Sequence, residues 1–211
     1  MNNKFNTGNT EIDKIFPVSG IILNLSSNLI FSLVFAVLMA ISANSFIYLP
    51  FTPIPVTTQV LTVLLSGLFL GSRWALTSQV FYILMGLMGF PVFSGFKNGI
   101  TALPGPTGGY IIGFMAAAFA TGYIYENLLK KNMSNTRRLF ACLASCTAGV
   151  ILIHLFGFIH LAGYFYSTGG VYPVSAILIK TWELGTRPFL IIDFLKVITA
   201  GIIINLNRIK K

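Results

Sequence analysis

Long apolar runs separated by short polar gaps make up most of the chain after about residue 25. A membrane-crossing helix needs about 20 consecutive, mostly apolar residues. The second and third runs are short and only GSRW (71–74) separates them, so we expect a helical hairpin there. The pattern predicts an all-α membrane protein with six transmembrane helices, at about 25–48, 56–71, 74–90, 109–129, 139–166 and 188–207.

The chain is expected to form a polar tail over 1–16 and a single transmembrane domain over 17–211. Connections at 49–55, 91–108 and 167–187 would lie together on one side of the membrane. The last two are long for unstructured loops, so we expect them to re-enter the membrane or to carry a short helix.

The positive charges indicate how the helices are oriented. Of the 14 Lys and Arg residues, 10 lie in the tail, in the 71–74 and 130–138 gaps and at the carboxyl end, whereas Lys97, Lys180 and Arg187 lie in the opposite connections. Lys196 lies inside a span. Cytoplasmic loops carry the excess of Lys and Arg, so both termini are predicted to be cytoplasmic.

Composition excludes several classes of protein. Apolar residues make up 55% of the chain and charged residues 9%, with a mean hydropathy of +0.81. So few charges cannot cover a soluble enzyme, and the apolar content excludes a disordered chain. The net charge of +9 is spread over short gaps, which argues against nucleic-acid binding. Cys142 and Cys146 lack further ligands at metal-binding spacing, so we expect packing residues and no metal or cofactor.

Asp193 and Lys196 lie within the last apolar run, RPFLIIDFLKVITAG (187–201). Three residues apart, they share one face of a helix. Each costs about 2.5–3.5 kcal/mol at the centre of a membrane helix, so neither is expected to face lipid. Two interpretations remain open: a site for a polar ligand or ion, and an internal pair that apolar residues could replace with little loss.

The predicted topology brings other polar features to the same layer. Spans two, four and six all begin at the outer face, and a rise of 1.5 Å per residue places Asp193 and Lys196 roughly 8 and 12 Å below it. Gln59 lies at a similar level in span two, and GPTGGY (105–110), which includes Tyr110, opens span four. This convergence predicts a small-molecule pocket that opens outward.

The glycine-rich turn has two interpretations. Thr107 can cap the helix that follows, and Gly108 and Gly109 permit close approach of another backbone. The free N–H groups of that helix end would suit an anionic or carbonyl group. The alternative is a tight cap that lets helices pack.

Three further features have mainly structural interpretations. Ala36 and Ala40, like the series from Gly109 to Thr121, are small residues at helical spacing and indicate close packing, either internal or with a partner helix. The proline-rich FTPIPV (51–56) predicts a stiff extended connector, which is a lid or a plain turn. His154 and His160 point about 240° apart on a helix and are interpreted as bundle residues. The chain offers no nucleophile and base pair, so we do not expect an enzyme.

Four motifs together resemble the BioY family, the substrate-binding membrane subunits (S-components) of energy-coupling-factor (ECF) biotin transporters. The resemblance spans about 25–207 and rests on PVTTQ (55–59), GLMGFPVF (86–93), GPTGGYIIGF (105–114) and RPFLIIDFLK (187–196). It implies a multi-pass cell-membrane protein whose transmembrane domain captures biotin at the outer face.

The resemblance also implies roles for particular residues. Asp193 and Lys196 would contact biotin, with Asn98 as a further candidate beside Gln59, Thr107, Gly108 and Tyr110. Ala36 and Ala40 would face a transmembrane coupling subunit. The sequence contains no nucleotide-binding motif, so uptake would require an ATP-binding-cassette ATPase as a further partner. A structural subunit in which Asp193 and Lys196 merely pair, and an intramembrane enzyme, are the rival hypotheses.

Overall fold

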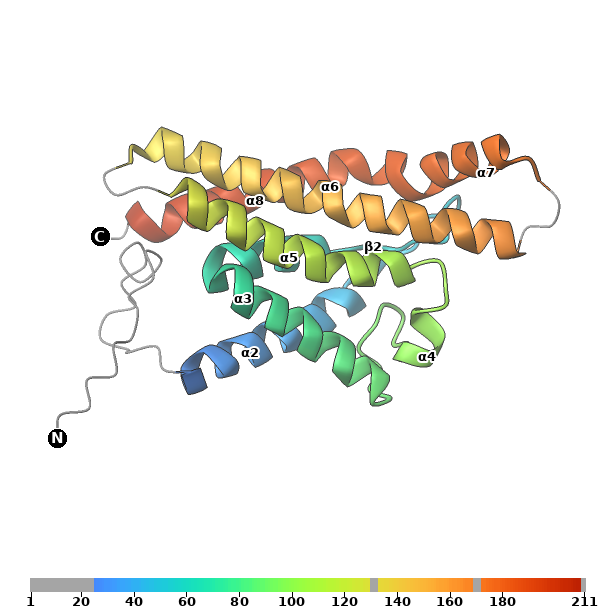
Figure 1. The fold of residues 1–211 in the computed structure, drawn as a ribbon, viewed down its shortest axis with the longest axis horizontal. Helices are drawn as coiled ribbons and strands as arrows, with labels where there is room; N and C mark the ends of the chain where they lie inside the picture. The colour runs from blue at the N-terminus through green and yellow to red at the C-terminus, as the bar shows by residue number, and fades with distance from the viewer. Residues whose placement is uncertain (1–24, 130–132, 169–171, 210–211) are drawn as a thin grey trace.

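The computed structural model describes residues 25–129, 133–168 and 172–209, and within them the chain is almost entirely helical (Figure 1). The tail over 1–16, Lys130 and Lys131 of the charge count, and the last two residues lie outside the described part. The elements are α2 (Leu25–Asn44), β1 (Phe46–Ile47), β2 (Val56–Thr57), α3 (Gln59–Leu87), α4 (Gly99–Ala102), α5 (Gly108–Leu128), α6 (Asn135–Thr168), α7 (Val174–Thr181) and α8 (Leu190–Ile209).

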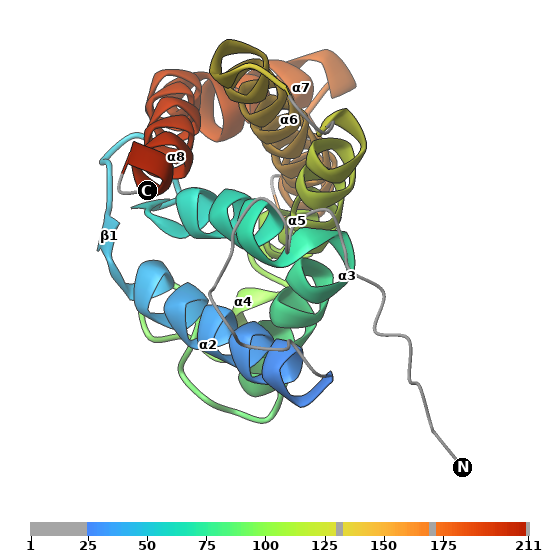
Figure 2. The same ribbon diagram turned by 90° about the vertical axis from the view of Figure 1, so that its left-hand side faces the viewer.

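Five described helical stretches are long and apolar enough to cross a membrane. They are α2, α3, α5, α6 and the stretch from α7 into α8. Figure 2 shows the bundle that these helices form, seen after a turn of 90°. The prediction of an all-α membrane protein is confirmed. The count of six spans and the side on which the termini lie stay predictions.

The two short spans expected at 56–71 and 74–90 form the two halves of α3. Gly71 has φ 76° and ψ 175°, a backbone conformation outside the helical range that glycine adopts without steric cost. The ribbon of α3 changes direction along its length (Figure 1). Glu126 of α5 caps the second half, because its carboxylate accepts from the Ser72 N–H at 3.0 Å and from the Ser72 hydroxyl at 2.9 Å.

The small-residue face of α2 packs inside this chain. Ala36, Met39 and Ala43 are fully buried, Ala40 packs against the same core, and the Ser32 hydroxyl donates to the Trp74 carbonyl at 3.0 Å. The resemblance implies that Ala36 and Ala40 face a coupling subunit, but Ala36 is fully buried and α2 packs mainly against α3, so Ala36 matches the internal-packing alternative. The exposed face of α2 consists of larger aliphatic residues: Ile30, Leu33, Val34, Val37, Leu38 and Ile41.

The connection expected over 167–187 is largely helical, in agreement with the short-helix alternative. From Val174 the chain passes through α7, a π-helical turn (Trp182–Thr186) and a 3₁₀ turn (Arg187–Phe189) into α8. α8 begins at Leu190, close to the predicted start at 188, but the helical stretch that leads into it begins at Val174, so the depth of Asp193 cannot be counted from residue 188.

Candidate functional site

A cavity lies among α3, α5, α6 and α8, below the connector that joins α2 to α3. Its empty space, including the opening to the outside, is about 580 Å³. The walls are mainly apolar. The lining residues are Ile54, Pro55, Thr57, Gln59, Val60, Tyr82, Ser94, Thr107, Tyr110, Ile111, Phe114, Ile153, His154, Phe189, Asp193 and Lys196.

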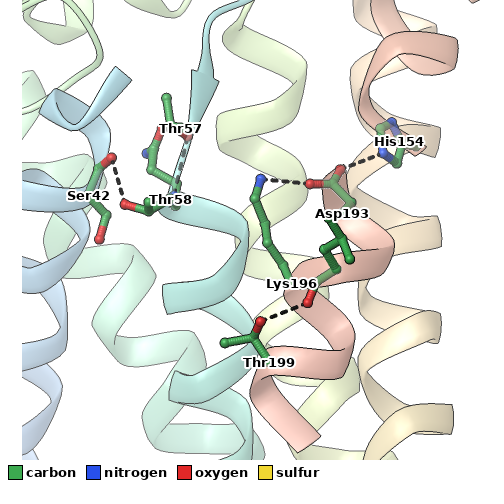
Figure 3. A network of polar contacts seen from close by, with 9 residues as sticks. Ser42, Thr57, Thr58, His154, Asp193, Lys196 and Thr199 are labelled. Atoms are coloured by element: carbon green, nitrogen blue, oxygen red, sulfur yellow. Dashed lines mark hydrogen bonds and ion pairs between the residues drawn. The ribbon is translucent and has the colours of Figure 1, made fainter. Parts of the chain in front are cut away.

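Asp193 is the centre of a charged network in the wall of this cavity. One carboxylate oxygen accepts from the Lys196 ammonium at 2.7 Å, and the other lies 2.9 Å from Nε2 of His154 on α6 (Figure 3). Asp193 is only 2% exposed and His154 9% exposed. The predicted Asp–Lys pair is therefore formed, and both of its members also line the cavity. A carboxylate with its counter-charge at a cavity surface can receive a ligand that has both hydrogen-bond donors and acceptors.

A second polar group lies at the start of α3. The side-chain amide of Gln59 donates to the Tyr82 hydroxyl at 2.9 Å, and its carbonyl accepts from the Thr57 hydroxyl at 3.2 Å. The Tyr82 hydroxyl in turn lies 3.4 Å from the Val92 carbonyl. Because Gln59 and Tyr82 come from the two halves of α3, the kink at Gly71 is what allows them to meet.

The glycine-rich turn contributes to the cavity in part. Thr107 and Tyr110 line it, and the Tyr110 hydroxyl donates to the Gly185 carbonyl at 2.7 Å. Gly108 and Gly109 serve close packing: an added Cβ would lie 1.9 Å from the Leu103 carbonyl oxygen at Gly108 and 2.2 Å from Cβ of His160 at Gly109. The contacts at these two glycines match the tight-cap interpretation.

Asn98 lies apart from the cavity in the described part of the chain. Its side chain caps α4 and accepts from the Thr101 N–H at 3.4 Å. Neither Asn98 nor Gly108 is among the described residues that line the cavity. Their positions around the glycine-rich turn suggested that both lie near the ligand, whereas in the structure Asn98 caps α4 and Gly108 packs against Leu103.

Two residues of the cavity region were missed as site candidates. His154 was interpreted as a bundle residue, yet it binds Asp193. Thr52 fastens the proline-rich connector, because its hydroxyl donates to the Leu184 carbonyl at 2.6 Å. Pro188 is the sequence feature that could have revealed this contact. Proline has no N–H, so in a helix it cannot donate to the carbonyl of the residue four positions earlier, which here is Leu184. That carbonyl needs another donor, and the connector supplies it.

The comparisons with known proteins agree with the motif resemblance. The model of the BioY family matches residues 11–211. The chain belongs to the BioY family. It is 34% identical over 171 residues to the biotin transporter BioY of Thermotoga maritima, a match that covers 81% of this chain and 89% of that protein. It is 35% identical over 151 residues to the probable biotin transporter BioY of Pyrococcus horikoshii, covering 72% and 78% of the two chains.

A solved structure supports the fold of this BioY family member. The S-component for biotin from an ECF-type ABC transporter matches with a TM-score of 0.68 over 88% of this chain and 91% of that chain. The two sequences are 22% identical, so the likeness extends to the arrangement of the helices.

Proposed function

We propose that this protein is the biotin-binding S-component of an ECF transporter in the cell membrane. It captures biotin from the outer side and delivers it across the membrane. The observation that carries the proposal is the cavity in whose wall Asp193 and Lys196 meet. The named function of its BioY relatives supports biotin as the ligand.

The chemistry of the cavity suits biotin. A ureido ring carries two N–H donors and one carbonyl acceptor, and Asp193 supplies the anionic acceptor while Lys196 supplies donors. Lys196 or the amino end of α5 would meet the valerate carboxylate. Apolar walls such as Ile111, Phe114 and Phe189 would cover the ring and the alkyl chain. Gln59, Thr107 and Tyr110 are proposed as further contacts, and Asn98 and Gly108 as residues that shape the turn beside them.

The proposed topology has six spans with both termini cytoplasmic. The two halves of α3 count as two spans because the non-helical residue Gly71 separates them, and Gln59 and Tyr82, from opposite halves, hydrogen-bond to each other. Uptake against a gradient would need a transmembrane coupling subunit and ATP-binding-cassette ATPases, because the sequence contains no nucleotide-binding motif. The exposed aliphatic face of α2 is available in this structure for the lipid or for the coupling subunit.

Calorimetric titration of the detergent-purified protein with biotin tests the proposal. We expect saturable 1:1 binding that desthiobiotin, which keeps the ureido ring, competes for and that thiamin and riboflavin leave unchanged. The proposal would be contradicted if protein that elutes as one sharp peak gave no heat of binding and bound no labelled biotin that unlabelled biotin could displace.

The connector over the cavity should control how fast biotin leaves. Ile54 and Pro55 line the cavity, and the Thr52 hydroxyl ties this segment to Leu184. Thr52→Val keeps the side-chain shape but leaves the Leu184 carbonyl without its donor and the Ile54 N–H without its acceptor, and an unsatisfied buried group costs about 1–3 kcal/mol. We expect dissociation of labelled biotin to become roughly 5- to 100-fold faster.

Thr199→Val is the matched control, since the Thr199 hydroxyl donates to the Leu195 carbonyl of its own helix on an exposed face. It should leave the dissociation rate unchanged. Equal rates for Thr52→Val and the unmodified protein would show that this hydrogen bond does not restrain the connector.

A further inference from the structure

We propose that His154 is a positioning residue for Asp193, and that its Nε2–H group sets how the carboxylate is presented to the ligand. This inference rests on the proposed function. His154 reaches Asp193 from another helix, across 39 positions of sequence, with Nε2 2.9 Å from the carboxylate oxygen that Lys196 does not bind. Both residues are buried and line the cavity.

The chemistry of the pair fixes the tautomer of the ring. An ionised carboxylate only accepts hydrogen bonds, so Nε2 must carry the proton and donate. Nδ1 is buried and has no hydrogen-bond partner among the described residues. In a neutral ring it is then the unprotonated nitrogen, since a buried N–H without an acceptor would be costly. The ring therefore acts as a fixed, single donor to Asp193.

The two donors act on different oxygens and so hold the carboxylate in place. Lys196 is on the same helix as Asp193 and reaches it with a long, flexible side chain, which alone would leave the carboxylate free to turn. His154 has a short side chain on α6, and its ring contacts the Tyr110 ring edge to face with 6.3 Å between centroids. The donor from α6 thus couples the orientation of Asp193 to the packing of α5, α6 and α8.

Three substitutions at position 154 separate the donor from the packing. Glutamine places an N–H donor where Nε2 stands, asparagine ends nearer the position of Nδ1 and cannot reach, and phenylalanine keeps the ring without a donor. We expect biotin affinity in His154→Gln within about threefold of the unmodified protein, and a loss of at least tenfold in His154→Asn and His154→Phe. Monodisperse elution and thermal unfolding of each variant would establish that it is folded.

Each outcome decides between the two proposals. Near-normal binding by His154→Phe, or equal losses in the Gln and Asn variants, would overturn the positioning role while the unmodified protein still binds biotin. If the unmodified protein does not bind biotin, the proposed function fails and this inference fails with it.

A measurement without substitution at position 154 gives an independent test. Nitrogen NMR of protein labelled with ¹⁵N-histidine reports which ring nitrogen carries the proton, and a His160→Gln variant assigns the two signals. We expect Nε2 of His154 to be protonated. A ring protonated on Nδ1 alone cannot donate to Asp193 and would overturn the inference.

Discussion

Asp193→Ala is expected to weaken biotin binding by about 100-fold or more. The substitution removes the anionic acceptor at the cavity wall, and hydrogen bonds to charged groups contribute about 1.5–3 kcal/mol each. It also leaves the Lys196 ammonium, whose side chain is 13% exposed, without its counter-charge. Removing one partner of a buried ion pair leaves an uncompensated buried charge, which destabilises the site around Lys196. Calorimetric titration with biotin measures the effect.

Two further variants test whether the weaker biotin binding of Asp193→Ala comes from the loss of the carboxylate itself. Leu195 lies between Asp193 and Lys196 in sequence but is 57% exposed on the outer side of α8, so Leu195→Ala should bind biotin normally. The double replacement Asp193→Leu with Lys196→Met removes both charges together and should fold, because buried ion pairs can be exchanged for apolar residues at little cost; the Nε2–H of His154 loses its acceptor, which costs about 1–3 kcal/mol. We expect the double variant to be stable and unable to bind. Normal binding by it would reduce the pair to a structural contact.

The relations within one helix were predictable from the sequence. The spacing of Asp193 and Lys196 predicted that they share a face, and the structure pairs them at 2.7 Å. The break at 71–74 was also visible as a gap between two apolar runs. In both cases the information lies within a few residues, where helical periodicity is a sufficient guide.

Relations between helices could not be predicted in the same way. His154 gives no local sign that its partner is Asp193, because helical spacing says nothing about which faces of α6 and α8 meet. The predicted start of the last span at 188 lies two residues before α8, which begins at Leu190, but helical periodicity did not show that the helix before it runs on into α8. The structure instead continues the helix through π and 3₁₀ turns and satisfies the freed carbonyl with Thr52.

Gly122→Ala is expected to destabilise the protein strongly, because Gly122 of α5 packs directly against the backbone at the kink in α3. An added Cβ at Gly122 would lie 2.4 Å from the Ser72 nitrogen and 2.6 Å from the Gly71 carbonyl carbon. Both are backbone atoms that no rotamer change can move. Overpacking of a core costs about 1–3 kcal/mol where side chains can adjust, so we expect about 3 kcal/mol or more here.

Gly163→Ala is the matched control, since none of the described residues of other elements lies within 4 Å of an added Cβ at that position of α6. Alanine there should be neutral or stabilise the helix by up to about 1 kcal/mol. Thermal unfolding in detergent should therefore separate the two variants, with Gly122→Ala melting well below and Gly163→Ala at or above the unmodified protein. Equal melting temperatures would mean that α5 does not press against the bend at Gly71. The contact matters for function because Gln59 and Tyr82, from opposite halves of α3, reach the cavity wall together only when the chain reverses there.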